Sequence, residues 1–195
     1  MKSPTVSLNF PLDLTIKLTE DNFFTICQNN PDLQFELTAS GELIIMPPTG
    51  GETGRFNLKL SYQIEKWNCQ SNLGEAFDSS TGFKLPNGAN RSPDVSWIKR
   101  ERWEALTPEE REKFPPICPD FVIELLSPSD DLKKTQEKLV EYINNGALLG
   151  WLIDRKNRRV EIYRPNREME IVENPVSLSG EDVLPGFVLD LTQIF

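Results

Sequence analysis

Two acidic residues lie in segments that are otherwise apolar. Asp94 follows Pro93 and opens the apolar run 95–98, and Glu124 lies inside the run 121–126. An ionised carboxylate is costly to bury unless a cation or several hydrogen-bond donors compensate its charge. Two carboxylates on neighbouring strands supply the hard oxygen ligands that Mg²⁺ and Mn²⁺ prefer, and such an ion can acidify a water molecule and neutralise charge on a phosphoryl group. The pair therefore predicts a Mg²⁺-type site.

Both carboxylates also have an explanation that needs no metal. Glu124 could pair with a buried lysine or arginine, and Asp94 could accept backbone N–H bonds at the end of a strand. The residues alone leave the two interpretations open.

The composition removes several kinds of catalytic site. The chain contains no histidine, which excludes Ser-His-Asp and Cys-His triads, HExxH zinc sites and HNH-type nucleases. Cys27, Cys69 and Cys118 are odd in number and form no CxxC pair, which argues against a disulfide framework or a zinc site. Catalysis would have to use Asp, Glu, Lys, Tyr or Ser, or a metal held by oxygen ligands.

The charge is acidic overall and basic in one segment. The net charge of −9 argues against general coating of nucleic acid, which depends on lysine and arginine. The exception is one basic segment, which contains Arg155, Lys156, Arg158, Arg159, Arg164 and Arg167. This segment is close in sequence to Lys133, Lys134 and Lys138. Composition alone favours reading this segment as a solvated helix and hairpin with ordinary salt bridges.

No segment resembles a membrane span or a secretory signal. The apolar runs are strand-sized, well short of the roughly 20 residues that cross a bilayer, and the N-terminus has no apolar core of a signal peptide. We expect a cytoplasmic protein with no membrane partner.

The periodicity predicts a single α/β (α+β) domain over residues 1–195 that positions these side chains. The residues 33–37 and 42–46 alternate as a hairpin, and the continuous run 121–126 suits a strand buried on both faces. Asp130 is expected to cap the helix 131–145, Asp120 to cap the start of the strand before it, and Trp97 and Trp151 to lie in the core. The other expected helices are one capped by Thr19 and running over 21–27 and one over 52–69 with Leu58, Tyr62 and Trp67 on its apolar face, to which Ile64 adds. Strands are expected over 12–18, 74–77, 82–85, 94–98, 150–154, 159–163 and 169–172, exposed helical turns within 99–114, and a short helix or extended segment at the C-terminus.

From residue 50 to the C-terminus the sequence resembles the Uma2 family, within the PD-(D/E)XK restriction-endonuclease-like superfamily. The resemblance covers most of the chain, in the right order. It rests on the segments 47–52 (PPTGGE), 91–96 (RSPDVS), 119–124 (PDFVIE), 127–130 (SPSD), 150–154 (GWLID) and 184–187 (LPGF), with Lys138 and Tyr142 between them. It implies a restriction-endonuclease-like mixed central β-sheet flanked by helices, with residues 1–49 as an N-terminal strand–helix–hairpin extension.

The resemblance also assigns roles to residues. It makes Asp94 and Glu124 metal ligands, and it makes Glu52 a further acidic ligand brought by the first long helix, although Glu52 could simply favour that helix dipole. The lysine of the superfamily pattern, two positions after the acidic residue, is Leu126 here. The expected replacement is Lys138, with Lys134 as the rival and solvated surface charges as the alternative for both.

Two residues of the helix 131–145 have expected roles at the site. Lys138 would orient the attacking water or stabilise charge on the phosphorane. Tyr142, one helical turn later, could hydrogen-bond a site carboxylate or simply belong to the core.

The implied reaction is Mg²⁺-dependent hydrolysis of a DNA phosphodiester, with Mn²⁺ as a substitute and a homodimer expected by analogy. The first alternative is a non-catalytic interaction or nucleic-acid-binding protein on the same scaffold, which the missing strand lysine and the acidic charge favour. A second alternative is a metal-dependent hydrolase of RNA or small phosphodiesters.

Overall fold

The computed structural model describes residues 18, 20–46 and 48–195. Most of the expected strand over 12–18, and the expected cap Thr19, lie outside these residues. The helices are α1 (Glu20–Asn29), α2 (Gly51–Ser71), α3 (Arg100–Glu104), α4 (Pro108–Arg111) and α5 (Leu132–Asn144). The strands are β1 (Gln34–Leu37), β2 (Leu43–Met46), β3 (Gly74–Asp78), β4 (Phe83–Lys84), β5 (Asn90–Arg91), β6 (Val95–Lys99), β7 (Phe121–Leu125), β8 (Leu149–Asp154), β9 (Arg159–Tyr163), β10 (Glu170–Glu173), β11 (Ser177–Ser179) and β12 (Val188–Asp190).

The centre of the fold is a six-stranded mixed sheet in the order β10-β9-β8-β7-β6-β3. Strands β7 and β8 are parallel, and the other neighbouring pairs are antiparallel. Every residue of β7 and β8 is buried. This matches the continuous apolar character of both segments, because a strand covered on both faces does not need to alternate.

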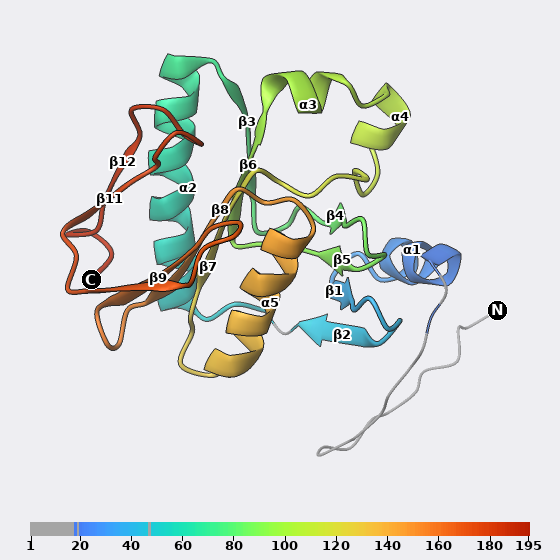
Figure 1. The fold of residues 1–195 in the computed structure, drawn as a ribbon. Helices are drawn as coiled ribbons and strands as arrows, with labels where there is room; N and C mark the ends of the chain where they lie inside the picture. The colour runs from blue at the N-terminus through green and yellow to red at the C-terminus, as the bar shows by residue number, and fades with distance from the viewer. Residues whose placement is uncertain (1–17, 19, 47) are drawn as a thin grey trace.

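Two helices cover opposite faces of this sheet (Figure 1). On one face, α2 contributes Phe56, Leu60 and Ile64 to a core that also holds Trp97, Trp151 and residues of the C-terminal segment. On the other face, α5 contributes Leu139 and Tyr142 to a second core. The burial of Trp97 and Trp151 in the core is as expected.

A smaller four-stranded sheet, in the order β2-β1-β5-β4, lies beside α5 (Figure 1). The predicted hairpin is confirmed, with Phe35 opposite Ile45. It joins the rest of the chain through β5, where Leu37 pairs with Asn90. This sheet therefore brings residues near position 36 next to α5.

The structure corrects the predicted apolar face of α2. Leu58 and Tyr62 are 71% and 63% exposed, and the buried face carries Phe56 and Leu60 beside Ile64, which was expected on it. The helix contains apolar residues on two sides, so the periodicity fitted more than one face, and only the position of the sheet decides between them.

The structure also corrects two details of helix capping and of the C-terminal segment. Asp131, not Asp130, caps α5 by accepting from the backbone N–H groups of Lys133 and Lys134, while Asp130 accepts from the N–H of Ser127 in the preceding turn. The C-terminal segment contains the hairpin of β11 and β12, which the sequence did not reveal. Within the described part of the chain, no helix is both long enough and apolar enough to cross a bilayer.

Candidate functional site

Glu124 on β7 meets two side chains of α5. The carboxylate is 7% exposed, and its Oε1 lies 2.9 Å from Lys138 Nζ. The hydroxyl of Tyr142 donates to the same oxygen at 3.2 Å. Lys138 and Tyr142 are one helical turn apart and therefore project from the same face of α5. The structure thus brings together three of the residues singled out in the sequence.

Asp94 lies next to this group, immediately before β6. Its Oδ2 accepts the backbone N–H of Leu125 at 2.8 Å, and its Oδ1 accepts the Asn57 amide at 2.7 Å. Strand β6 runs antiparallel to β7, with Val95 opposite Ile123. This pairing, and the bond to the residue that follows Glu124, hold both carboxylates at one end of the central sheet.

A third buried carboxylate, Glu36 on β1, was not among the predicted site residues. It is 3% exposed and lies 2.8 Å from Lys138 Nζ. It also accepts the backbone N–H of Ser92 at 2.9 Å and pairs with Arg91 at 3.1 Å, while Arg91 reaches Glu141 at 2.6 Å. Acidic and basic side chains therefore alternate along one series of ion pairs, in the order Glu141, Arg91, Glu36, Lys138 and Glu124.

The surroundings shift the pKa values of these groups in different directions. Burial opposes ionisation of Glu36, but the charges of Lys138 and Arg91 outweigh it and hold its pKa below the ordinary value. Burial raises the pKa of Glu124 to about 8, with a contribution from the charge on Asp94 and against the pull of Lys138. Burial also raises the pKa of Asp94.

Lys138 behaves as a permanent cation in this group. Its burial disfavours the charge, but Glu124 and Glu36 more than compensate and raise its pKa above the ordinary lysine value. Glu36 is its fixed counterion because the pKa of Glu36 is held below the ordinary value, whereas burial raises the pKa of Glu124. Its three N–H groups face Glu36, Glu124 and the carbonyl oxygen of Ser92, so Lys138 can neutralise charge but cannot serve as a general base.

The oxygen atoms at this end of the sheet are of the kind that hard divalent cations accept. Asn57 Oδ1 is buried and accepts no hydrogen bond from the described residues, although the nitrogen of the same amide is bonded to Asp94. An orphaned amide oxygen on a side chain that contacts Asp94 is a ligand of the kind that Mg²⁺ and Mn²⁺ accept, as are the oxygens of the two carboxylates. Among the described residues, no three acidic, histidine or cysteine side chains are grouped closely enough to hold a metal, so Glu52, Asp94 and Glu124 do not form such a group.

Two predicted residues lie apart from these contacts. Glu52 occupies the first turn of α2, is 70% exposed and pairs with Arg55 at 2.8 Å and Arg155 at 3.9 Å. Lys134 is exposed on α5, and the lysine that reaches Glu124 is Lys138. The residue of α2 that contacts Asp94 is Asn57.

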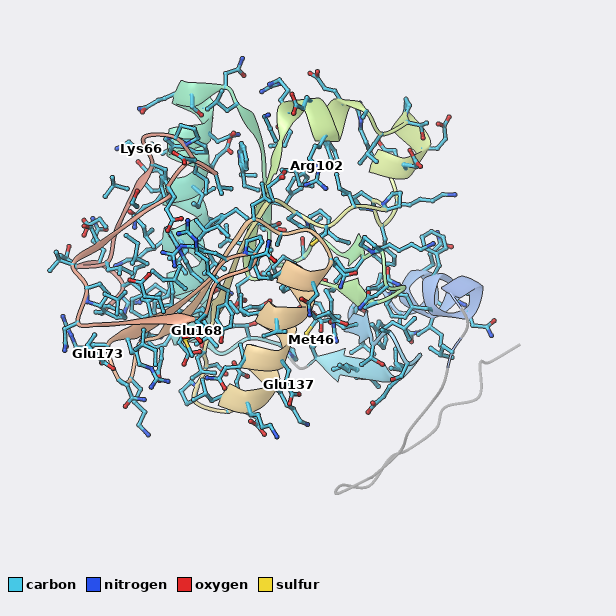
Figure 2. The ribbon with its side chains drawn as sticks, viewed as in Figure 1. Met46, Lys66, Arg102, Glu137, Glu168 and Glu173 are labelled. Atoms are coloured by element: carbon cyan, nitrogen blue, oxygen red, sulfur yellow. The ribbon has the colours of Figure 1, made fainter. Side chains whose placement is uncertain are left out.

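An open cleft of about 850 Å³ leads to Glu124 between the β1–β2 hairpin and α5. Figure 2 shows Met46 and Glu137, which lie on its two sides. Its charged lining consists of seven carboxylates and three cations, namely Glu36, Glu42, Glu124, Asp130, Asp131, Glu137 and Glu141 with Arg91, Lys134 and Lys138. Negative charge therefore predominates, which suits a cation better than a phosphate.

The mixed sheet, with two acidic residues at one end and a lysine supplied from the flanking helix, defines a restriction-endonuclease-like fold. A crystal structure described as "a putative nuclease belonging to DUF820 from Anabaena variabilis ATCC 29413" has this fold and matches with a TM-score of 0.70, at 23% identity, over 83% of this chain and 89% of that chain. A family model, Uma2, described as "Putative restriction endonuclease", matches residues 20–192. The chain belongs to the Uma2 family. A search of curated proteins found no match.

These comparisons confirm the family and the fold that the sequence predicted, and the family is the one whose description names a restriction endonuclease. The roles of the individual site residues stay predictions, because a match to a family or to a fold does not by itself assign a catalytic role to a side chain.

Proposed function

We propose that this protein is a Mg²⁺-dependent endonuclease that hydrolyses DNA phosphodiester bonds at the site formed by Asp94, Glu124 and Lys138. The observation that carries the proposal is the contact between Lys138 Nζ and Glu124 at 2.9 Å. It brings a helix-borne cation to Glu124 in a chain that has Leu126 where the superfamily pattern has a lysine on the strand.

The chain's own residues divide the work. The carboxylates of Asp94 and Glu124, with the amide oxygen of Asn57, would hold the ion. A bound Mg²⁺ lowers the pKa of water and neutralises charge on the phosphoryl group. Lys138, protonated and held by Glu36, would orient the attacking water or stabilise the charge of the phosphorane by exchanging its contact with Glu124 or with the carbonyl oxygen of Ser92.

The substrate and the assembly are part of the same proposal. DNA is the substrate that the family description favours, and Mn²⁺ would replace Mg²⁺ because both accept the same oxygen ligands. Cutting both strands of a duplex needs two sites, so we propose a homodimer, which light scattering on the purified protein would test.

One observation favours a second function, a non-catalytic binding protein on the nuclease scaffold. Lys138 is already paired with two carboxylates, and the cleft that leads to Glu124 is mostly acidic. A phosphate group would meet repulsion there unless a metal ion first neutralised it.

The deciding experiment is cleavage of supercoiled plasmid with Mg²⁺ and then Mn²⁺. Wild type is compared with Asp94→Ala, Glu124→Ala and Lys138→Met, and with Glu173→Ala as a matched loss of an exposed carboxylate on the edge strand β10 (Figure 2). We expect each site substitution to reduce the rate about 100-fold or more, because removal of one catalytic group typically costs that much. The Glu173 variant should cut like wild type.

The other outcomes have distinct meanings. Equal cutting by all variants would reveal a contaminating nuclease. If folded wild type does not cut, and millimolar Mg²⁺ or Mn²⁺ does not raise its melting temperature, the enzyme proposal fails, because an ion that binds only the folded state must stabilise it.

A further inference from the structure

A group of cations gathers around one aromatic ring near the candidate site. The guanidinium of Arg155 lies 3.5 Å from the centre of the Phe56 ring, and that of Arg55 lies 4.4 Å from it. Lys59 Nζ lies 5.5 Å from the same ring. A guanidinium stacked on a ring keeps its N–H groups directed outward in its own plane, so the stacking fixes the charge without consuming its donors.

This group lies at the same end of the central sheet as the candidate site. Strand β8 runs parallel to β7, with Leu125 opposite Ile153, so the turn that follows β8 lies beyond the end of β7 that carries Glu124. Phe56 is the immediate neighbour of Asn57, which contacts Asp94. Figure 1 shows the start of α2, the loop from β7 into α5 and the β8–β9 turn together at the lower end of the molecule.

The positive charge of this turn is only weakly compensated. Glu52 is the acidic partner of Arg155, at 3.9 Å, but the same carboxylate lies closer to Arg55, at 2.8 Å, so one negative charge serves both arginines. Arg155 Nε is buried without an acceptor among the described residues. Lys156 and Arg158 are exposed and form no ion pair with any residue that the structure describes. Arg164, from the same basic segment, differs, because Glu181 and Glu170 pair with it at 2.6 and 2.9 Å.

We propose that Arg155, Lys156 and Arg158 of the β8–β9 turn, together with Arg55, form a phosphate platform that binds the backbone of the nucleic-acid strand beside the bond to be cut. This inference rests on the proposed function, since it assigns the contact that holds the substrate of that site. The acidic cleft cannot attract a polyanion, so the attraction must come from another surface at the same end of the sheet. The platform supplies it in a chain whose net charge is −9.

The test is binding of a fluorescent 20-base-pair duplex, measured by anisotropy in EDTA over a range of salt concentrations. EDTA prevents cleavage, and contacts to phosphate need no metal. The test variant is Lys156→Gln with Arg158→Gln, whose exposed side chains are not needed for the core. The matched control is Lys66→Gln with Lys99→Gln, two exposed lysines near the opposite end of the sheet, where Figure 2 shows Lys66.

We expect the platform variant to lower the slope of log K against log salt by about 1 to 2, because each lost phosphate contact removes about 0.9. Its affinity near 0.1 M salt should fall about tenfold, while the control stays within about twofold of wild type. Arg155→Met, which keeps contact with the Phe56 ring but removes the charge, should lower the slope by about 1.

The outcomes separate this inference from the proposed function. If wild type cuts plasmid but the platform variants bind with unchanged slope, the inference is wrong and the nuclease function stands. If the platform substitutions lower the slope of log K against log salt but wild type never cuts DNA, the phosphate platform stands and catalysis is refuted. If wild type binds neither duplex nor single strand at low salt, the platform is refuted.

Discussion

Replacement of Glu36 by glutamine tests whether the ion-pair group is as interdependent as its geometry indicates. Glu36 is 3% exposed and faces Lys138 at 2.8 Å and Arg91 at 3.1 Å. Removing one partner of a buried ion pair typically costs about 3–5 kcal/mol, because it leaves a buried charge uncompensated. Lys138 and Arg91 each keep a second carboxylate, Glu124 and Glu141, so we expect the lower end, about 3 kcal/mol.

The assay is urea unfolding followed by circular dichroism. A loss of about 3 kcal/mol lowers the midpoint by roughly 1 M or more, since slopes of about 1–3 kcal/mol/M are typical. Glu42→Gln, at an exposed position on the same cleft, is the control and should change stability by less than about 0.5 kcal/mol. A loss below about 1 kcal/mol for Glu36→Gln would refute the view that Glu36 neutralises both cations.

Two further predictions concern backbone packing and thiol chemistry. Gly54→Ala should raise stability by about 0.5–1 kcal/mol, because a Cβ on this exposed helical residue meets nothing. Gly74→Ala should lower stability by about 1–3 kcal/mol in the same urea unfolding experiment, since its Cβ would strike the backbone oxygen of Ile98 and the ring of Trp97. Equal midpoints for the two variants would contradict this. Burial raises the pKa of Cys118 to about 12, so its thiol stays protonated in the folded protein between pH 7 and 9. Cys118 should therefore resist a thiol reagent that labels the exposed Cys69. Labelling of Cys118 at the rate of Cys69 without denaturant would contradict this.

Much of the candidate site could be predicted from the sequence because its signals are local. Glu124 interrupts an apolar strand, and Asp94 opens another. The helical spacing of Lys138 and Tyr142 puts both on one face of α5. The metal-free contacts that the sequence also allowed for the two carboxylates are present, since Glu124 pairs with Lys138 and Asp94 accepts a backbone N–H from Leu125. These contacts alone fit both a structural and a catalytic role for the two carboxylates. The expectation of a catalytic role therefore came from the family match.

Glu36 and Asn57 could not be found in this way. Glu36 lies on the polar side of an alternating strand, which normally faces water, and only the position of α5 over that side buries it. Asn57 is a weak helix former inside α2, but a single polar residue does not indicate which face meets the sheet. The same ambiguity led to the wrong apolar face through Leu58 and Tyr62. What was missed depends on which elements pack together, and short-range periodicity does not contain that information.

The ionic link from the first hairpin to α5 also bears on when the site comes into existence during synthesis. Glu36, Glu124 and Lys138 lie far apart in the sequence yet share one cluster of contacts. Contacts between distant segments form late in folding, after the entropy of closing the long intervening loops has been overcome. A nascent chain that has emerged from the ribosome only as far as Glu124 carries both acidic residues of the family pattern but not the lysine that completes them. The contacts of Lys138 with Glu36 and Glu124 therefore cannot form until synthesis has passed α5, so an unfinished chain that ends at Glu124 holds both acidic residues of the candidate site without the lysine beside them.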